Sequence, residues 1–320
     1  MGVADWAKVR SAPSSSGADD KEQVDRVTID VPRSAVSAAS PAPVAGQVAG
    51  RPMRPMIEIS HVDKIFITVR NERIHALSDI NLKVADREFI TIVGPSGCGK
   101  STLLKILAGL LDLTKGAVTL DGTPVKSPRR DIGMMFQSPV LLPWRSILEN
   151  IMLPVEVQGL SKAKSRERAM QLLHMVGLDG FDNKYPMELS GGMQQRAAIC
   201  RALINDPRIL LMDEPFGALD AMTREQMNLD LQRIWADSGK TVVLITHSIP
   251  EAVFLGDRVI VMSPRPGRIT QVVDVPIPRP RPIEAMGDPL FGQLTSQIRK
   301  LLYGMDSARA SVTVSGGGLG

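Results

Sequence analysis

The sequence predicts an α/β fold, in which a parallel sheet forms the core beside a smaller antiparallel β subdomain and an inserted α-helical subdomain. Three observations lead to this prediction. Short, dense apolar runs suit strands buried on both faces of a parallel sheet, and amphipathic helical stretches separate these runs. Between residues 57 and 84, apolar residues alternate with polar ones, as in half-buried antiparallel strands. Residues 138–203 show helical periodicity and little strand signal, which predicts the helical insert.

The individual elements follow in chain order. "IEISHV" and "INLKV" are the two expected antiparallel strands. "EFITIV", "ILLMD", "TVVLIT" and "RVIVM" are the four expected buried strands. "KSTLLKILAGLL" places leucines on one helical face, and "TREQMNLDLQRIWADSG" predicts a helix that ends at a glycine.

The ends of the chain have a different composition. Residues 1–55 are rich in Ser, Ala, Pro and Gly and predict a disordered extension, because so few large apolar side chains cannot offset the entropy of ordering. The C-terminal "SVTVSGGGLG" predicts disorder for the same reason. We therefore expect a folded domain over residues 56–275, followed by a C-terminal tail over residues 276–320.

The composition restricts the classes of function. A hydrophobic content of 43% and a charged content of 22% are ordinary for a globular protein, and no run reaches the roughly 18 apolar residues of a membrane helix. The net charge of +4 is spread along the chain, which argues against a nucleic-acid partner. Cys98 and Cys200 lack metal-ligand spacing and suit a reducing compartment.

A first phosphate site is predicted by "GPSGCGKST", which fits the pattern G-x-x-x-x-G-K-[ST] between a buried strand and a helix. In such a loop the backbone N–H groups and the helix N-terminus hold phosphate oxygens. Lys100 is expected to neutralise phosphate charge and Ser101 to bind Mg²⁺. An incidental glycine-rich turn does not explain the flanking strand and helix. The predicted nucleotide-binding residues are Gly94, Pro95, Ser96, Gly97, Cys98, Gly99, Lys100, Ser101 and Thr102.

Two adjacent carboxylates end the buried strand "ILLMD". Asp213 is placed to reach a Mg²⁺ ion, and Glu214 to polarise an attacking water. An Asp-Glu pair alone is a common surface feature. Next to a phosphate-binding loop it predicts hydrolysis of a nucleoside triphosphate.

A second candidate site lies at "LSGGMQQR", residues 189–196, where no strand precedes the glycines and a helix can follow. Ser190, Gly191 and Gly192 would then lie at a helix N-terminus with free N–H groups. Taken alone, these residues fit two interpretations: an ordinary capped helix start, or a site for an anion.

The order of these motifs resembles the nucleotide-binding subunit of an ABC transporter. The resemblance covers residues 56–275 and rests on "GPSGCGKST", "MMFQSP", "LSGGMQQR", "ILLMDEP", "GALD" and "THS". It implies a P-loop NTPase fold of the ABC ATPase type, binding ATP and Mg²⁺. In that family two cassettes pack head to tail, so Ser190, Gly191 and Gly192 would hold the γ-phosphate of the partner's ATP. Met193 stands where many members have glutamine, but the serine and both glycines are kept.

The same resemblance implies further roles. Gln137 would touch Mg²⁺ and the attacking water, and His247 would contact the γ-phosphate. Both join Glu214 as catalytic residues, while Mg²⁺ would be held by Ser101, Gln137 and Asp213. Asp220 would link the two sites across the dimer. Phe66 either stacks on adenine or is an ordinary core phenylalanine.

A finer resemblance points to the import ATPases of the nitrate, sulfonate and taurine group, which includes relatives that import pyrimidine precursors. It is carried by "LLPWRSILENIMLP", "DEPFGALDAMTREQM", "SPRPGRI" and "VPIPRPRP". It implies a separate integral-membrane permease, an extracytoplasmic solute-binding protein, and a peripheral location on the cytoplasmic face of the membrane. The second cassette is expected to be another copy of this chain. Trp144 lies either in the permease-docking region or in a packed helical subdomain.

Two alternatives differ in class. A soluble, non-transport ABC ATPase of DNA repair would carry a long coiled coil between the two phosphate sites, and the stretch from Lys100 to Ser190 is too short for one. A P-loop kinase or GTPase would not account for Gln137, Ser190 and His247 together.

Overall fold

The computed structural model describes residues 55–314, with side chains described for residues 55–304. All of these belong to one compact unit, Arg51–Gly320. The N-terminal extension expected at residues 1–55 lies outside the described residues except for Pro55, and so do residues 315–320.

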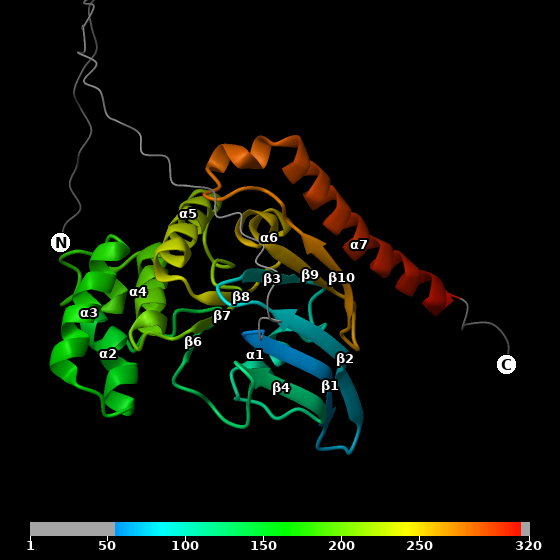
Figure 1. The fold of residues 1–320 in the computed structure, drawn as a ribbon, viewed down its shortest axis with the longest axis horizontal. Helices are drawn as coiled ribbons and strands as arrows, with labels where there is room; N and C mark the ends of the chain where they lie inside the picture. The colour runs from blue at the N-terminus through cyan, green and yellow to red at the C-terminus, as the bar shows by residue number, and fades with distance from the viewer. Residues whose placement is uncertain (1–54, 315–320) are drawn as a thin grey trace, which may run out of the picture. The chain divides into compact units, whose positions relative to one another are not determined.

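Within residues 55–314, the main sheet has six strands in the order β10-β9-β3-β8-β7-β6 (Figure 1). Neighbouring strands run parallel, except that β10 is antiparallel to β9. The four buried strands expected from the sequence are present as β3, β7, β8 and β9. The strands are β3 (Phe89–Val93), β6 (Ile132–Met135), β7 (Ile209–Asp213), β8 (Thr241–Ile245), β9 (Arg258–Met262) and β10 (Ile269–Asp274).

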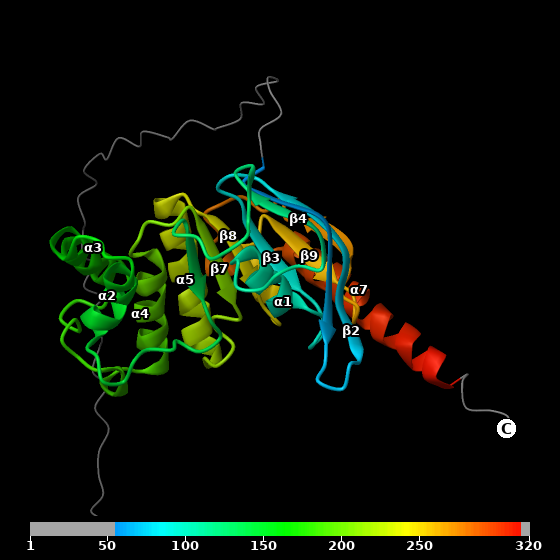
Figure 2. The same cartoon turned by 90° about the horizontal axis from the view of Figure 1, so that it is seen from below.

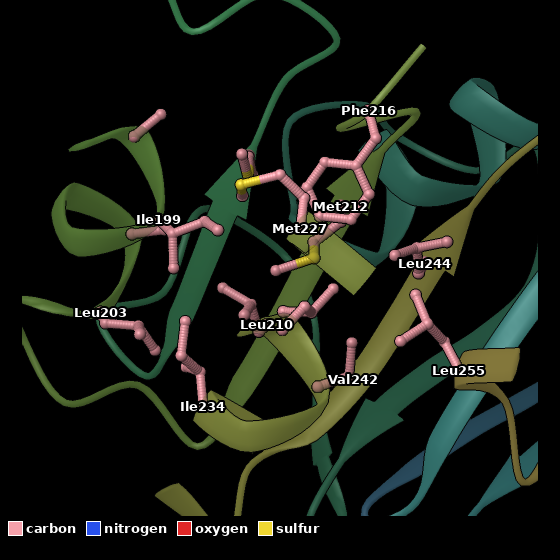
Figure 3. Close-up of a cluster of buried hydrophobic side chains, with 14 of the residues drawn as sticks. Ile199, Leu203, Leu210, Met212, Phe216, Met227, Ile234, Val242, Leu244 and Leu255 are labelled. Carbon is pink, nitrogen blue, oxygen red and sulfur yellow. The ribbon is translucent and has the colours of Figure 1, made fainter. Parts of the chain in front are cut away.

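The continuous apolar runs arise because this sheet is covered on both faces. In β7, Leu210 and Met212 belong to one hydrophobic cluster, whereas Ile209 and Leu211 belong to the other. Figure 3 shows the first cluster, in which Leu210 and Met212 face side chains of the surrounding helices, such as Ile199. Because alternate residues on one strand meet two different cores, no polar face is left.

A second sheet, in the order β2-β1-β4-β5, is antiparallel. The expected strands at residues 57–62 and 80–84 lie within β1 and β2. The strands are β1 (Ile57–Ile67), β2 (Arg73–Val84), β4 (Lys115–Leu120) and β5 (Thr123–Pro124). Helix α1 (Lys100–Leu107) shares one hydrophobic cluster with both sheets, so it joins them around the phosphate-binding loop.

Between β6 and β7 the described chain forms helices only, and Figure 2 shows these on the opposite side of the main sheet from β1, β2 and β4. They are α2 (Ile147–Val157), α3 (Lys162–Met175), the short 3-10 helix η1 (Pro186–Glu188) and α4 (Gly191–Leu203). Helix α5 (Ala221–Ser238) ends just before Gly239, as the sequence predicts, and α6 (Ile249–Leu255) follows β8.

Two expectations need correction. Helix α1 ends at Leu107 rather than at residue 111, because the backbone turns at Gly109 with a φ of 69°. The second concerns the C-terminal tail, for which the sequence predicts disorder only at residues 311–320: it forms η2 (Ile283–Gly287) and α7 (Pro289–Val314). Phe291, Leu294 and Ile298 bury one face of α7 against the main core, and the helix continues through residues 311–314, where the composition predicts disorder.

Candidate functional site

The phosphate-binding loop joins β3 to α1, as the sequence predicts. Gly97 and Gly99 have φ values of 71° and 108°, in the region that favours glycine. A Cβ at Gly99 would come within 2.6 Å of Leu77 Cδ2 and 2.9 Å of the Ala76 carbonyl oxygen. The loop therefore needs glycine at Gly99 for both backbone conformation and space.

Lys100 is the first residue of α1 and is only 5% exposed. Its Nζ donates hydrogen bonds to the carbonyl oxygens of Gly94 at 2.8 Å and Pro95 at 3.0 Å. The ammonium group is thus folded back over its own loop, where it is pre-positioned beside any bound phosphate.

Ser101 and Asp213 meet although they are far apart in sequence. The Ser101 hydroxyl donates to Asp213 Oδ1 at 3.0 Å, because α1 follows β3 while Asp213 ends β7 in the same parallel sheet. A hydroxyl and a carboxylate are hard oxygen donors of the kind that Mg²⁺ prefers, so this pair fits the expected ion.

Glu214 lies at the centre of the remaining predicted residues. Its Oε1 is 2.5 Å from Nε2 of His247, and its Oε2 accepts a hydrogen bond from Gln137 Nε2 at 3.3 Å. The residue has a φ of 49°, a left-handed conformation that is uncommon and strained for a non-glycine side chain. Segments after β6, β7 and β8 therefore meet at the carboxyl ends of the strands.

A cavity of about 260 Å³ lies over the loop. Lys100, Ser101, Glu214 and His247 all line it, so these four predicted residues share one space, whereas Gln137 lines neighbouring cavities. Phe66 lines it too and is 36% exposed, so it is not a core phenylalanine.

Arg265, which no sequence motif predicts, also lines this cavity. Its guanidinium donates to the carbonyl oxygen of Gly97 at 3.4 Å. The only signal was the "SPRPGRI" stretch, which gave no hint that the arginine reaches the loop. Cys98, inside the loop, is fully buried, and burial raises the pKa of its thiol, so it is poorly suited to act as a nucleophile.

Glu251 was missed as well. It lies in the first turn of α6 and is 4% exposed, in a second cavity of about 440 Å³ that Glu214, His247 and Arg224 also line. Burial raises the pKa of the Glu251 carboxyl to about 7, the Glu214 charge adds to this, and Thr246 and Arg224 oppose it. An unremarkable glutamate in a helix thus becomes a carboxyl that titrates near neutrality beside the site.

The second candidate phosphate site, Ser190–Gly192, lies apart from this cavity. Ser190 is the N-cap of α4, and its hydroxyl accepts a hydrogen bond from the N–H of Met193 at 3.4 Å. Ser190 and Gly191 are exposed, and neither they nor Gly192 line the cavity over the loop. Ser190 therefore caps the helix, and the start of this helix is exposed at the surface.

Asp220 and Trp144 are also at the surface. Asp220 is the N-cap of α5 and accepts a hydrogen bond from the Thr223 N–H at 3.0 Å. Hydrogen bonding by Thr223 lowers the pKa of its carboxyl. Trp144 is 70% exposed, so the packed helical-subdomain interpretation is wrong.

Among the described residues, no helix combines the length and apolar character that a membrane span needs.

Comparison with known proteins agrees with this geometry. Residues 77–217 match the family model described as "ABC transporter". An ABC transporter ATP-binding protein of Methanocaldococcus jannaschii is 50% identical over 229 residues, which are 72% of this chain and 85% of that protein. The taurine import ATP-binding protein TauB of Rhizobium johnstonii is 44% identical, over 80% of this chain and 100% of its own.

Solved structures show the same fold. An ATP-binding cassette in a dimeric post-hydrolysis state, bound to ADP and Pi, superposes with a TM-score of 0.61 at 38% identity. The match covers 69% of this chain and 99% of that one. The P-loop core, the antiparallel β subdomain and the helices between β6 and β7 are thus those of an ATP-binding cassette.

Proposed function

Because the chain belongs to the ABC transporter family of ATP-hydrolysing cassettes, we propose that two copies work as a pair, each ATP lying between the loop of one copy and the α4 start of the other. One observation carries this proposal. Ser190 and Gly191 are exposed and lie outside the nucleotide cavity of their own chain. An anion site at a helix N-terminus that its own chain does not use is suited to a second protomer.

The residues divide the work as follows. Residues 94–102 cradle the phosphates, and Lys100 neutralises their charge. The oxygen donors of Ser101, Asp213 and Gln137 would hold Mg²⁺, which would screen the phosphate charge.

Glu214 and the groups around it carry out the hydrolysis. Its carboxylate polarises the attacking water and takes up the proton that the water loses. His247 would contact the γ-phosphate, and Phe66 would stack on adenine. Asp220 sits at the dimer contact, where it links the two sites.

The domain division is part of the proposal. Residues 56–275 form the cassette, and its helical insert, residues 138–203, faces a permease. A groove of about 450 Å³ between β6, α2 and α4 supports this, since Phe136, Val140 and Val157 are exposed apolar residues along it. The exposed Trp144 lies in the same stretch of sequence.

The proposed cargo class is a small solute of the nitrate, sulfonate or taurine kind, or a pyrimidine precursor. The name of the Rhizobium johnstonii relative supports an importer over the alternative of a soluble, non-transport ABC ATPase. In this scheme a solute-binding protein delivers the solute to an integral-membrane permease, and the cassettes lie on the cytoplasmic face. ATP closes the pair, closure moves the permease, and hydrolysis resets it.

The test is the solution mass of Glu214→Gln, measured by light scattering with and without Mg-ATP. Removing the base should trap ATP, so a monomer that doubles in mass only with ATP is expected. Adding Ser190→Arg should abolish the doubling. A monomer at saturating ATP, with binding shown by a fluorescent ATP analogue, would contradict the paired arrangement.

Import is tested separately in a bacterium that lacks its own taurine-import ATP-binding protein. Restored taurine uptake, lost again with Lys100→Ala, would support the sulfonate assignment. Active ATPase without uptake would oppose that assignment.

A further inference from the structure

One motif has no role in the scheme above: "VPIPRPRP", residues 275–282, which we call the strap. Arg281 at its end is 1% exposed and is among the largest fully buried side chains described. Burial lowers the pKa of its guanidinium to about 10, so the group remains charged at neutral pH. Each hydrogen bond recorded for this guanidinium goes to a backbone carbonyl.

The guanidinium closes the C-terminal end of α6. Nη1 donates to the carbonyl oxygens of Val253 at 2.9 Å, Phe254 at 2.8 Å and Gly256 at 2.8 Å. The last carbonyls of a helix have no partner within it and form the negative end of its dipole. Arg281 therefore supplies from outside both the donors and the charge that this short helix lacks.

The strap itself is firmly anchored. Gln232 of α5 bonds the backbone of Arg281 on both sides, its Oε1 accepting from the N–H and its Nε2 donating to the carbonyl oxygen, each at 2.8 Å. Arg279 pairs with Asp257 at 2.8 Å and lies 4.3 Å over the ring of Trp235. In Figure 1 the segment between β10 and α7 crosses the side of the molecule where α5 and α6 lie.

The other end of α6 leads into the site. The helix starts at Ile249, two residues after His247, and Ser248 caps it by accepting from the Glu251 N–H at 3.3 Å. Residues 251–255 are all buried, and the four apolar ones pack in the same hydrophobic cluster as the main sheet, so the packing of α6 fixes the chain that leads back to His247. The 2.5 Å pairing of His247 with Glu214 therefore depends on where α6 sits.

We propose that Arg281 is a positioning residue: by holding the C-terminal end of α6, the strap sets His247 against Glu214 for hydrolysis. This inference rests on the proposed roles of His247 and Glu214. Arg281 does not line the cavity over the phosphate-binding loop, and that loop is built on β3 and α1. Its loss should therefore affect turnover rather than ATP binding.

The variants are Arg281→Gln, which removes the charge and most donors, and Arg281→Lys, which restores a charge with a single ammonium group. Gln232→Leu loosens the strap while leaving the arginine in place, and serves if Arg281→Gln does not fold. Arg299→Gln, exposed on α7, is the matched control.

Two quantities are measured in the four variants and in the wild type. The first is steady-state ATPase, where Arg281→Gln should lower kcat about tenfold or more with little change in KM, because a small displacement of a reacting group is costly. The second is the ring NMR signal of His247 in nucleotide-free protein. The chain has four histidines, so His247→Gln assigns this signal directly.

Arg281→Gln should shift the His247 ring signal, Arg281→Lys should recover part of both effects, and Gln232→Leu should shift the signal less. Arg299→Gln should match the wild type in both. If thermal stability falls while the ring signal and kcat stay as in the wild type, the strap is only structural and the inference is wrong. The ring signal needs no ATPase, so wild-type protein without ATPase activity would refute the proposed function and leave this test intact.

Discussion

Glu251 offers a quantitative test of the electrostatics next to the site. Its carboxyl has an ordinary pKa of 4.5, and burial raises this to about 7 in the folded chain. The folded state thus binds a proton more tightly than the unfolded state. Through this group, the free energy of unfolding is highest below pH 4.5, falls as the pH rises, and levels off above about pH 7.

The size of the effect follows from that shift. Each pKa unit is worth about 1.4 kcal/mol, so the wild type should lose about 2 to 3 kcal/mol between pH 5 and pH 8 through this one group. Glu251→Gln keeps the shape but cannot ionise. It should therefore show a flatter dependence and be the more stable protein at pH 8.

The assay is urea unfolding at several pH values between 5 and 8, with Glu225→Gln, exposed on α5, as control. The difference between Glu251→Gln and the wild type should grow with pH, whereas the control difference should stay constant. Parallel curves for wild type and Glu251→Gln would refute the reasoning, because they would mean that the buried carboxyl meets no desolvation cost.

Two further predictions concern Arg265, which is exposed, and Ser146, which is partly buried. Arg265→Gln should raise the KM for ATP about two- to fivefold with kcat unchanged, since an exposed charge contributes only up to about 1 kcal/mol of binding; an unchanged KM in steady-state assays would remove Arg265 from the site. Ser146→Ala removes the N-cap of α2, whose capping box joins Ser146 to Glu149 at 3.2 Å and 2.8 Å. It should destabilise the protein by about 1 kcal/mol in urea unfolding, and Ser146→Asp should restore most of the loss.

Much of the fold is encoded locally. The strands β7 and β8 are continuous apolar runs because both faces of the sheet are covered, and that pattern is visible in sequence alone. By contrast, β6 contains Gly133, where a Cβ would lie 2.4 Å from the Ala202 carbonyl oxygen. In the sequence, a glycine that close packing requires cannot be distinguished from a glycine in a turn, so this strand was not predicted.

The residues of the site likewise fall into those that the sequence predicts and those that it does not. The loop residues and Glu214 occur in motifs, because phosphate binding fixes residue type at fixed spacing. Arg265, Glu251 and Arg281 occur in none, because their surroundings come from distant segments: Arg281 meets α6 and α5 through residues 25 or more positions away. Their importance depends on burial and on partners that only the folded chain brings together.

The pairing of cassettes is the central claim, and the most direct test mixes two inactive variants. Lys100→Ala disables the loop, and Ser190→Arg disables the α4 start, so each protein alone should show no single-turnover ATP hydrolysis. A mixed pair would combine the intact loop of one chain with the intact Ser190 of the other. If the cassettes pair in this way, mixing restores hydrolysis. A mixture that is as stable as the wild type but as inactive as its two components would contradict the pairing.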